Sequence, residues 1–432
     1  MDTAEQSDVL FSDVRVFDGF ADRLSDPCHV LVRGGLIESI AAQAPAQART
    51  SGPECRVIDG GGRTLMPGLI DAHWHAAFAS LPMSALQLAD AGYVAIASAF
   101  AARQTLLRGF TSVRDAGGPV FGLKLAIDRG LTTGPRIYPS GAFISQTAGH
   151  GDFRTPNEVP RGLCGHLSHA EILGASVIAD GVPEVLRAVR EQLMHGASQI
   201  KMMAGGGAAS AYDPIDVTEY TEDEMRAGVE AAANWGTYVL VHAYTPRAVQ
   251  QALRAGVRCI DHGHLLDDTT VAMIAEHGAW WSMQPFLDDE DAIPLENPVS
   301  RAKQLKVIQG TENAYALAKK HGVKLAWGTD TLFDAKLATR QGAQLVKMRK
   351  WFRPAQVLRM ATSANAELLA MSGERNPYPG KLGVVREGAI ADLLLVDGDP
   401  LANLDLLATP ETGLPVIMKG GRVYKNTLPS AG

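Results

Sequence analysis

The middle of the chain repeats one pattern, in which a helical segment is followed by a glycine and then by a short apolar segment. The pattern is clear in VPEVLRAVREQLMHGA followed by SQIKMMAGGG, and again in DEMRAGVEAAANWG followed by TYVLVHAYT. Strands that alternate with helices in this way form parallel sheets, because each helix carries the chain back to the same edge. About eight such strands predict an α/β fold with a closed (β/α)8 TIM barrel. The expected strands are residues 69–75, 111–114, 136–140, 200–204, 238–242, 259–262, 280–284 and 325–329.

The two ends of the chain have a different pattern. VLFSDVRVFDG and HVLVRGGLIESI near the start, and PVIMKGGRVYKN near the end, alternate apolar and polar residues and break at glycine. This alternation is typical of short strands joined by turns. We therefore expect one small β-sandwich-like domain built from residues 1–66 and 377–432, with the barrel inserted at 67–376. Residues 145–175 lack periodicity and are expected to form a long loop after the third strand, and such loops are usually functional.

The overall composition excludes several classes of protein. The net charge is −7 and no stripe of lysine and arginine is present, so we expect no nucleic-acid partner. The sequence contains no run of ~18 apolar residues, so we expect no membrane span. The start, MDTAEQSDVLF, lacks the basic and apolar regions of a signal peptide, which favours a cytoplasmic location unless a leader was removed. The cysteines have no metal-type spacing and are expected to be isolated thiols: Cys28, Cys55, Cys164 and Cys259.

Side chains that can bind a metal lie at the carboxyl ends of several expected strands. In GLIDAHWHAAF two histidines are two residues apart, a spacing that places both on one face of a strand with Cα atoms roughly 7 Å apart. The carboxyl ends of barrel strands surround one opening, and active sites are built there. Six residues from five strands are therefore expected to converge: His73, His75, Lys201, His242, His262 and Asp330.

Each of these residues has an ordinary interpretation when it is considered alone. A histidine at a strand end is usually a structural residue, and Asp330 in GTD could cap a helix. Lys201 is harder to explain, because a parallel strand is buried on both faces and a buried ammonium must be neutralised, paired or chemically changed. Together the six favour a site for zinc or a similar divalent ion with an open position for water. The ion would lower the pKa of that water, and a nearby aspartate could act as a base.

Several segments resemble the amidohydrolase superfamily, the urease-like metal-dependent hydrolases. They are MPGLIDAHWH, IKMMAGGG, VLVHAY, CIDHGHL, LAWGTD and GAIADLLLVDGDP. The order TSVRDAGG, SGAFISQTAGHGD and HAY is similar to the Xaa-Pro dipeptidase-like branch, close to its bacterial ochratoxin A-hydrolysing members. The resemblance implies two divalent metal ions, with Zn²⁺ expected. His73, His75 and Asp330 would hold one ion and His242 and His262 the other. Lys201, carboxylated by CO₂, would bridge the two ions.

The resemblance also implies residues that contact the substrate. His150 in TAGHGD would contact the scissile group or the substrate carboxylate, and Tyr244 would bind the C-terminal carboxylate. The ordinary interpretations are a solvated loop histidine and a packed tyrosine, and His264 is a weaker candidate. Residues 205–207 are not followed by GK[ST], so we interpret them as room for substrate near the metals. Four aromatic residues could line a leaving-group pocket or belong to the core: Phe78, Phe143, Trp281 and Phe286.

The expected activity is hydrolysis of an amide bond in N-acyl amino acids or dipeptides that have a free C-terminal carboxylate. Ochratoxin A, which would give ochratoxin alpha and phenylalanine, fits this description. The alternatives are a cyclic-amide hydrolase similar to imidazolonepropionase or hydantoinase, and an organophosphate or lactone hydrolase. A non-catalytic barrel would require broken ligands. The expected partner is a small-molecule amide, and the resemblance implies a homo-oligomer such as an octamer.

Overall fold

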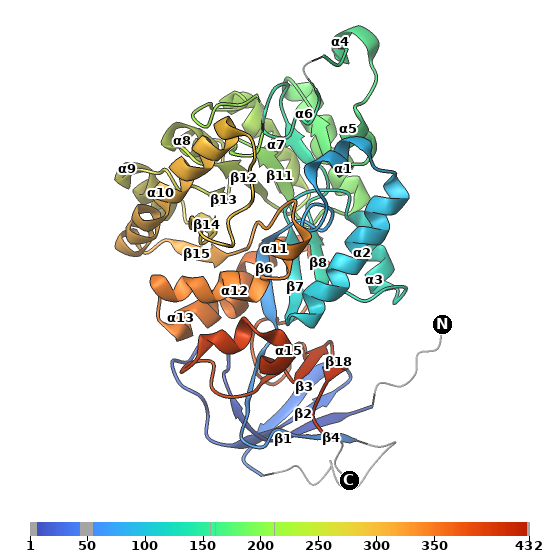
Figure 1. Ribbon diagram of the computed structural model, residues 1–432, viewed down its shortest axis with the longest axis vertical. Helices are drawn as coiled ribbons and strands as arrows, with labels where there is room; N and C mark the ends of the chain where they lie inside the picture. The colour runs from blue at the N-terminus through green and yellow to red at the C-terminus, as the bar shows by residue number, and fades with distance from the viewer. Residues whose placement is uncertain (1–6, 44–54, 156, 160, 211, 430–432) are drawn as a thin grey trace.

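The computed structural model describes residues 7–43, 55–155, 157–159, 161–210 and 212–429. Figure 1 shows a large α/β part above a smaller β-rich part. The strands are β1 Val9–Val16, β2 Cys28–Arg33, β3 Leu36–Ala41, β4 Arg56–Asp59, β5 Thr64–Pro67, β6 Leu69–Trp74, β7 Phe110–Asp115, β8 Arg136–Pro139, β9 Phe143–Ser145, β10 Ser176–Ile178, β11 Ile200–Met203, β12 Val239–Ala243, β13 Cys259–His262, β14 Trp280–Met283, β15 Lys324–Trp327, β16 Leu393–Val396, β17 Val416–Lys419 and β18 Arg422–Asn426.

The helices lie mainly between the strands of the α/β part. They are α1 Met83–Leu88, α2 Ala91–Leu107, α3 Phe121–Asp128, α4 Arg161–Cys164, α5 His169–Ile172, α6 Val182–His195, α7 Glu222–Asn234, α8 Pro246–Arg254, α9 Asp268–Glu276, α10 Pro298–His321, α11 Ala335–Ala338, α12 Gln341–Val346, α13 Pro354–Arg359, α14 Asn365–Ala370 and α15 Pro410–Gly413. Helices α6 and α10 end at left-handed glycines, Gly196 and Gly322. Glycine adopts this conformation without strain, which explains the glycine that ends each predicted unit.

The β-rich part contains strands from both ends of the chain. Its sheet has the order β18-β17-β16-β5-β1-β2-β3, and β4 also pairs with β1. The antiparallel pair of β16 with β5 joins the late strands to the early ones. Its core includes Phe11, Val30, Ile37 and Leu393, all buried. This arrangement agrees with one β-rich unit drawn from both termini, while the boundaries at residues 66 and 377 stay a prediction.

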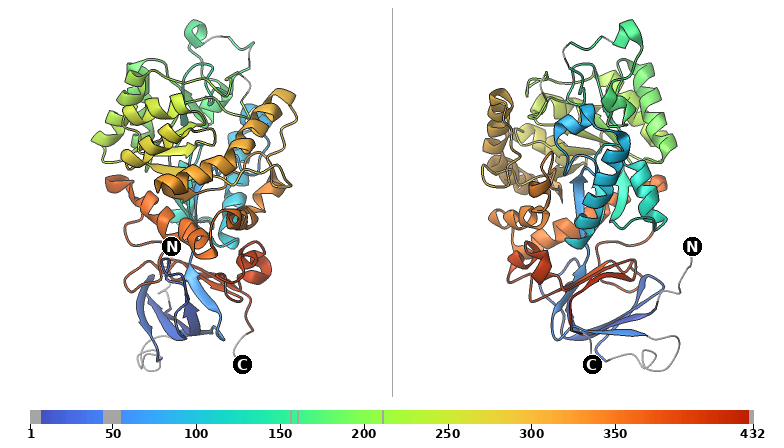
Figure 2. Two further views of the ribbon diagram at one scale, coloured as in Figure 1. Left: turned by 90° about the vertical axis from the view of Figure 1, so that its left-hand side faces the viewer. Right: turned by 45° about the vertical axis from the view of Figure 1, so that its right-hand side comes forward.

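The eight strands expected in the α/β part are present as β6, β7, β8 and β11 to β15. They form parallel sheets of order β6-β7-β8 and β10-β9-β11-β12-β13-β14-β15. Hydrogen bonds link these sheets at both margins. Ser198 N donates to Pro139 O (2.7 Å) beside β8, and Asp330 N donates to His73 O (2.9 Å) after β15. Figure 2 shows the helices around the outside of the strands. The carboxyl ends of strands far apart in sequence therefore lie close together.

Residues 145–175 are mostly irregular, as expected, but they contain two short helices that the sequence analysis did not predict. Strand β9 ends where the segment begins, α4 and α5 lie within the segment, and β10 follows it and pairs with β9 in parallel. Helix α5 begins with a capping box, in which the Ser168 side chain accepts from Glu171 N and the Glu171 carboxylate accepts from Ser168 N. The sequence SHAE carries this signal, but the helix is too short to show periodicity.

Two further expectations concern thiols and membrane spans. Cys28, Cys55 and Cys259 are free thiols, and the side chain of Cys164 lies outside the described ones. Within the described part of the chain, every helix is too short or too polar to cross a lipid bilayer.

Candidate active site

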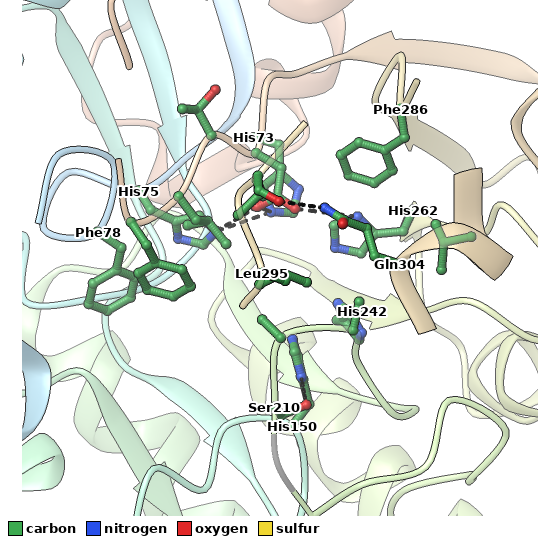
Figure 3. Close-up of a pocket in the computed structure, with 18 of the residues that line it drawn as sticks. His73, His75, Phe78, His150, Ser210, His242, His262, Phe286, Leu295 and Gln304 are labelled. Atoms are coloured by element: carbon green, nitrogen blue, oxygen red, sulfur yellow. Dashed lines mark hydrogen bonds and ion pairs between the residues drawn. The ribbon is translucent and has the colours of Figure 1, made fainter. Parts of the chain in front are cut away.

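A cavity lies at the carboxyl ends of the parallel strands, and Figure 3 shows its lining. All the candidate residues for metal and substrate line this cavity, although they come from five strands and one loop. They are His73, His75, His150, Lys201, His242, Tyr244, His262 and Asp330. The structure therefore brings together all eight of these predicted residues. The weaker candidate, His264, does not line the cavity.

His73, His75 and Asp330 form a compact triangle of potential ligand atoms. The Nε2 atoms of the two histidines are 3.2 Å apart, and they lie 3.4 Å and 3.5 Å from Asp330 Oδ1. Zinc bonds of about 2.0–2.1 Å at tetrahedral angles hold ligand atoms about 3.3–3.4 Å apart. The separations in the triangle match this value, so these residues fit one tetrahedral divalent ion.

The protonation states in the triangle suit a cation. Burial lowers the pKa of His73 to about 4. Burial opposes ionisation of Asp330, but His73, His75 and His262 outweigh it and hold the pKa of that carboxyl below its ordinary value. His75 Nδ1 lies 2.9 Å from Gly117 O, which places the ring proton there and leaves the Nε2 lone pair free. At neutral pH His73 is a neutral donor and Asp330 an anion, which is the state that binds metal.

His242 and His262 form a second group next to this triangle. Their ring centroids are 4.5 Å apart, and burial lowers the pKa of both well below the ordinary value. His262 Nδ1 lies 2.8 Å from Gln284 Oε1. Ligand atoms of His73, His262 and Asp330 all lie within 4.8 Å of one another. The two histidines are therefore close enough to share a metal centre with the triangle.

Two of these residues have a backbone conformation that is unusual for a side chain with a Cβ. His262 has φ 75° and Asp330 has φ 49°, both in the left-handed region. Such residues cost of order 1–3 kcal/mol and persist where the surrounding structure holds them. Both occur where the chain leaves a parallel strand. Strain at these two strand ends is consistent with a functional role for both side chains.

Lys201 is buried, and its charge is matched by a carboxylate that the sequence reasoning missed. Its Nζ lies 3.2 Å from Asp261 Oδ2 in β13, and Asp261 Oδ1 lies 2.8 Å from Arg114 Nη2 in β7. Burial lowers the pKa of Lys201. The argument that singled out Lys201, a charge inside a doubly buried strand, applies equally to Asp261 in CIDH and Arg114 in TSVRD.

His150 reaches the cavity from the loop after β9. Its ring stacks on His242, with centroids 4.0 Å apart, and its Nδ1 lies 2.7 Å from Ser210 Oγ and 3.5 Å from Asp213 Oδ2. A Cβ at Gly207 would lie 1.9 Å from the His150 ring. The space at Gly207 therefore accommodates the ring of His150, and the interpretation of this glycine as room for substrate needs correction.

Tyr244 is buried and lies edge-on to His242, with ring centroids 4.9 Å apart. Burial raises the pKa of Tyr244 above its ordinary value, so its hydroxyl stays protonated and can donate a hydrogen bond. His264 Nε2 lies 2.9 Å from Gln284 O, and its ring packs on Phe286. Of these two candidates, Tyr244 lines the cavity and His264 does not.

Apolar side chains form part of the cavity wall on two sides. Phe78 and Phe143 lie 5.7 Å and 5.4 Å from the His75 ring, and Phe286 lies on the other side, near His262. Trp281 instead is fully buried and donates its Nε1–H to His262 O, so it belongs to the core. Three of the four aromatic candidates therefore line the cavity.

A parallel α/β fold with histidines, a lysine and an aspartate gathered at the strand ends is typical of hydrolases that use metal ions. The chain belongs to the amidohydrolase family, whose sequence profile matches residues 64–423.

Individual relatives and solved structures indicate which members of the family this chain is similar to. The chain is 32% identical over 373 residues to the ochratoxinase of Aspergillus niger, covering 84% of this chain and 75% of that protein. A solved amidohydrolase structure has a TM-score of 0.87 at 38% identity, covering 98% of this chain and 100% of the other. A prolidase solved with N-methylphosphonate-L-proline has a TM-score of 0.87 at 35% identity, with the same coverage. The chain is thus similar to ochratoxinase and to prolidase-like amidohydrolases.

Proposed function

We propose that the chain is a binuclear metal-dependent amidohydrolase that cleaves N-acyl amino acids or dipeptides with a free C-terminal carboxylate. Ochratoxin A, an acyl group joined by an amide bond to phenylalanine, is the first substrate to test. The observation that carries the proposal is the triangle of His73, His75 and Asp330, whose ligand atoms lie 3.2–3.5 Å apart. Similarity to an ochratoxinase and a prolidase supports the choice of an amide substrate.

The proposal includes a closed (β/α)8 barrel as the support of the site. The parallel order of β6 to β8 and of β11 to β15 supports it, together with the bond from Asp330 N to His73 O. Asn365 adds a second tie, because its Nδ2 donates to Ile70 O and Trp327 O at 2.7 Å each. The domain boundaries, at residues 1–66 and 377–432 around 67–376, and assembly into a homo-oligomer are part of the same proposal.

We infer that the site holds two divalent ions, with zinc as the first candidate. His73, His75 and Asp330 would hold one ion, His242 and His262 the other, and Lys201 would bridge them after carboxylation. When bound, such ions lower the pKa of a water molecule and stabilise negative charge on a carbonyl oxygen. The lowered pKa of Lys201 supports carboxylation, because only the neutral amine reacts with CO₂.

Protein side chains would transfer the proton and bind the substrate. Asp330 stays ionised beside His73 and His75, so its carboxylate can accept a proton from the attacking water and pass it to the leaving nitrogen. Tyr244 keeps its phenolic proton and would donate a hydrogen bond to the substrate carboxylate. His150 has its Nδ1 engaged by Ser210, which leaves Nε2 for the substrate.

The walls of the cavity support apolar groups on both sides of the scissile amide. Phe78 and Phe143 are near His75, and Phe286 is near His262. A flat aromatic acyl group and an apolar amino acid would each bury surface there, at about 25 cal/mol per Å² of apolar area. This arrangement favours acyl-phenylalanine substrates over amides of polar amino acids.

A chromatographic hydrolysis assay on zinc-loaded protein tests the proposal. The panel comprises ochratoxin A, acyl-phenylalanines, Xaa-Pro dipeptides and the methyl ester of each, with a cyclic amide and a phosphotriester as competing classes. Cleavage of the free acids without the esters is expected. Equal cleavage of acids and esters, or cleavage of only the cyclic amide or the phosphotriester, would contradict the proposed binding of the substrate carboxylate.

A further inference from the structure

A network of buried charges lies behind the metal triangle and is centred on Asp261. The side chain of Asp261 is fully buried, and its two oxygens face different neighbours. Oδ1 lies 2.8 Å from Arg114 Nη2, while Oδ2 lies 3.2 Å from Lys201 Nζ and 3.0 Å from His73 Nδ1. One carboxylate therefore contacts a buried arginine on one side and two proposed metal-site residues on the other.

Arg114 is held at several points around this carboxylate. Its Nε donates to Ala72 O at 2.5 Å, and its Nη1 lies 3.4 Å from Tyr238 Oη and 3.2 Å from Cys259 Sγ. The guanidinium is planar, so these bonds and the one to Asp261 fix its orientation. The position of Asp261 is consequently set from the side opposite the metal site.

The charges of this network are balanced within the protein. An isolated buried carboxylate is costly, but a buried arginine with several hydrogen bonds supplies the opposite charge. The 2.8 Å contact with Arg114 therefore provides Asp261 with a buried partner of opposite charge.

The carboxylate of Asp261 lies next to one of the two ring nitrogens of His73. Asp261 Oδ2 lies only 3.0 Å from His73 Nδ1. His73 Nδ1 nevertheless has no well-aligned hydrogen bond to any described residue. An anion at Nδ1 favours the tautomer protonated there, which leaves the lone pair of Nε2 in the triangle with His75 and Asp330. The same oxygen positions the amine of Lys201.

We propose that Asp261 and Arg114 are a positioning pair for the metal centre. Asp261 fixes the tautomer and orientation of His73 and the position of Lys201, and Arg114 holds Asp261 in place. The inference rests on the proposed metal site but not on the identity of the substrate. Loss of such an outer partner typically weakens metal binding 10- to 100-fold.

The β-rich part contains a matched control. Asp392 is buried and pairs with Arg136 through bonds of 3.1 Å and 3.2 Å, and neither residue lines the cavity. Asp392→Asn thus removes the charge of a buried aspartate–arginine pair without touching the cavity lining. Any loss that is only structural should appear equally in Asp392→Asn and Asp261→Asn.

Zinc competition with a chelating dye, in the absence of substrate, is the test. Asp261→Asn and Arg114→Lys are expected to raise the zinc dissociation constant about 10- to 100-fold, with Asp392→Asn within about threefold of wild type. Zinc binding by folded Asp261→Asn that equals wild type would overturn the proposal. The same would follow if Asp392→Asn weakened zinc binding to the same extent as Asp261→Asn.

A second measurement uses the wild-type protein and so does not depend on the folding of a variant. Long-range ¹H–¹⁵N correlation spectra of the zinc-loaded, [¹⁵N]histidine-labelled chain report the protonated nitrogen of each ring. The His73 signals, assigned by their loss in His73→Gln, should show a proton on Nδ1. A proton on Nε2 would overturn the proposal. Failure of amide hydrolysis with these two results intact would contradict only the proposed function.

Discussion

The imidazole of His150 lies almost flat against that of His242, with ring centroids 4.0 Å apart and 23° between the planes. A residue from the long loop after β9 is thereby placed on a proposed metal ligand at the end of β12. Ser210 holds the other side of the His150 ring through Nδ1. The relationship places a loop histidine in the cavity wall, directly beside a proposed metal ligand.

His150→Ala is predicted to lower kcat/KM for free-acid substrates by about 10- to 100-fold while bound zinc per chain stays unchanged. The reason is the loss of a hydrogen bond to a charged substrate group, worth about 1.5–3 kcal/mol. Steady-state kinetics and metal analysis measure the two effects. Ser210→Ala, which removes only the positioning bond to His150, should cost less. Loss of zinc from His150→Ala would instead assign this residue to the metal centre.

His73→Ala is predicted to reduce bound zinc and to lower kcat by more than about 100-fold, because it removes a ligand and not merely an outer partner. Metal content by mass spectrometry and kcat on an acyl-phenylalanine measure the effect. His264→Gln is the matched control, since His264 is also buried but contacts the Gln284 carbonyl. Undiminished zinc and rate in folded His73→Ala would contradict the ligand assignment.

Tyr244→Phe is predicted to weaken the preference for free acids over methyl esters about 10- to 100-fold. The phenol stays protonated in the buried site, and its bond to a carboxylate would be worth about 1.5–3 kcal/mol. The ratio of kcat/KM for an acid to that for its ester measures this preference directly. An unchanged ratio would show that the carboxylate is bound elsewhere.

Glu219→Gln is predicted to stabilise the fold more at pH 8 than at pH 5. Glu219 is fully buried, and burial followed by the charge of Asp213 raises its pKa from 4.5 to about 8. Between these values the folded chain binds more protons than the unfolded chain, so rising pH costs wild type about 1.4 kcal/mol per unit. Thermal unfolding of both proteins across this range measures the difference. A constant difference in stability from pH 5 to 8 would refute the raised pKa.

The strand-end residues could be predicted because they depend on local rules. Two-residue spacing places His73 and His75 on one face, and parallel strands bring their carboxyl ends to one edge wherever they stand in the sequence. His242, His262 and Asp330 follow from the same rule. Each lines the cavity as expected.

Other features depend on contacts between distant segments. Asp261 and Arg114 could each have been singled out as charges inside buried strands, but their pairing depends on the approach of β13 to β7, 147 residues apart along the chain. Gly207 faces His150 because two loops approach each other, which spacing within either loop does not indicate. Helices α4 and α5 have four residues each, too few for a helical period to be visible.

Metal removal and restoration tests most directly whether the triangle of His73, His75 and Asp330 supports amide hydrolysis. Protein freed of metal with a chelator would be assayed on an acyl-phenylalanine before and after titration with zinc. Activity is predicted to disappear on chelation and to return in proportion to bound zinc, reaching a plateau at two ions per chain. Undiminished hydrolysis by protein that mass spectrometry shows to be free of metal would contradict this account.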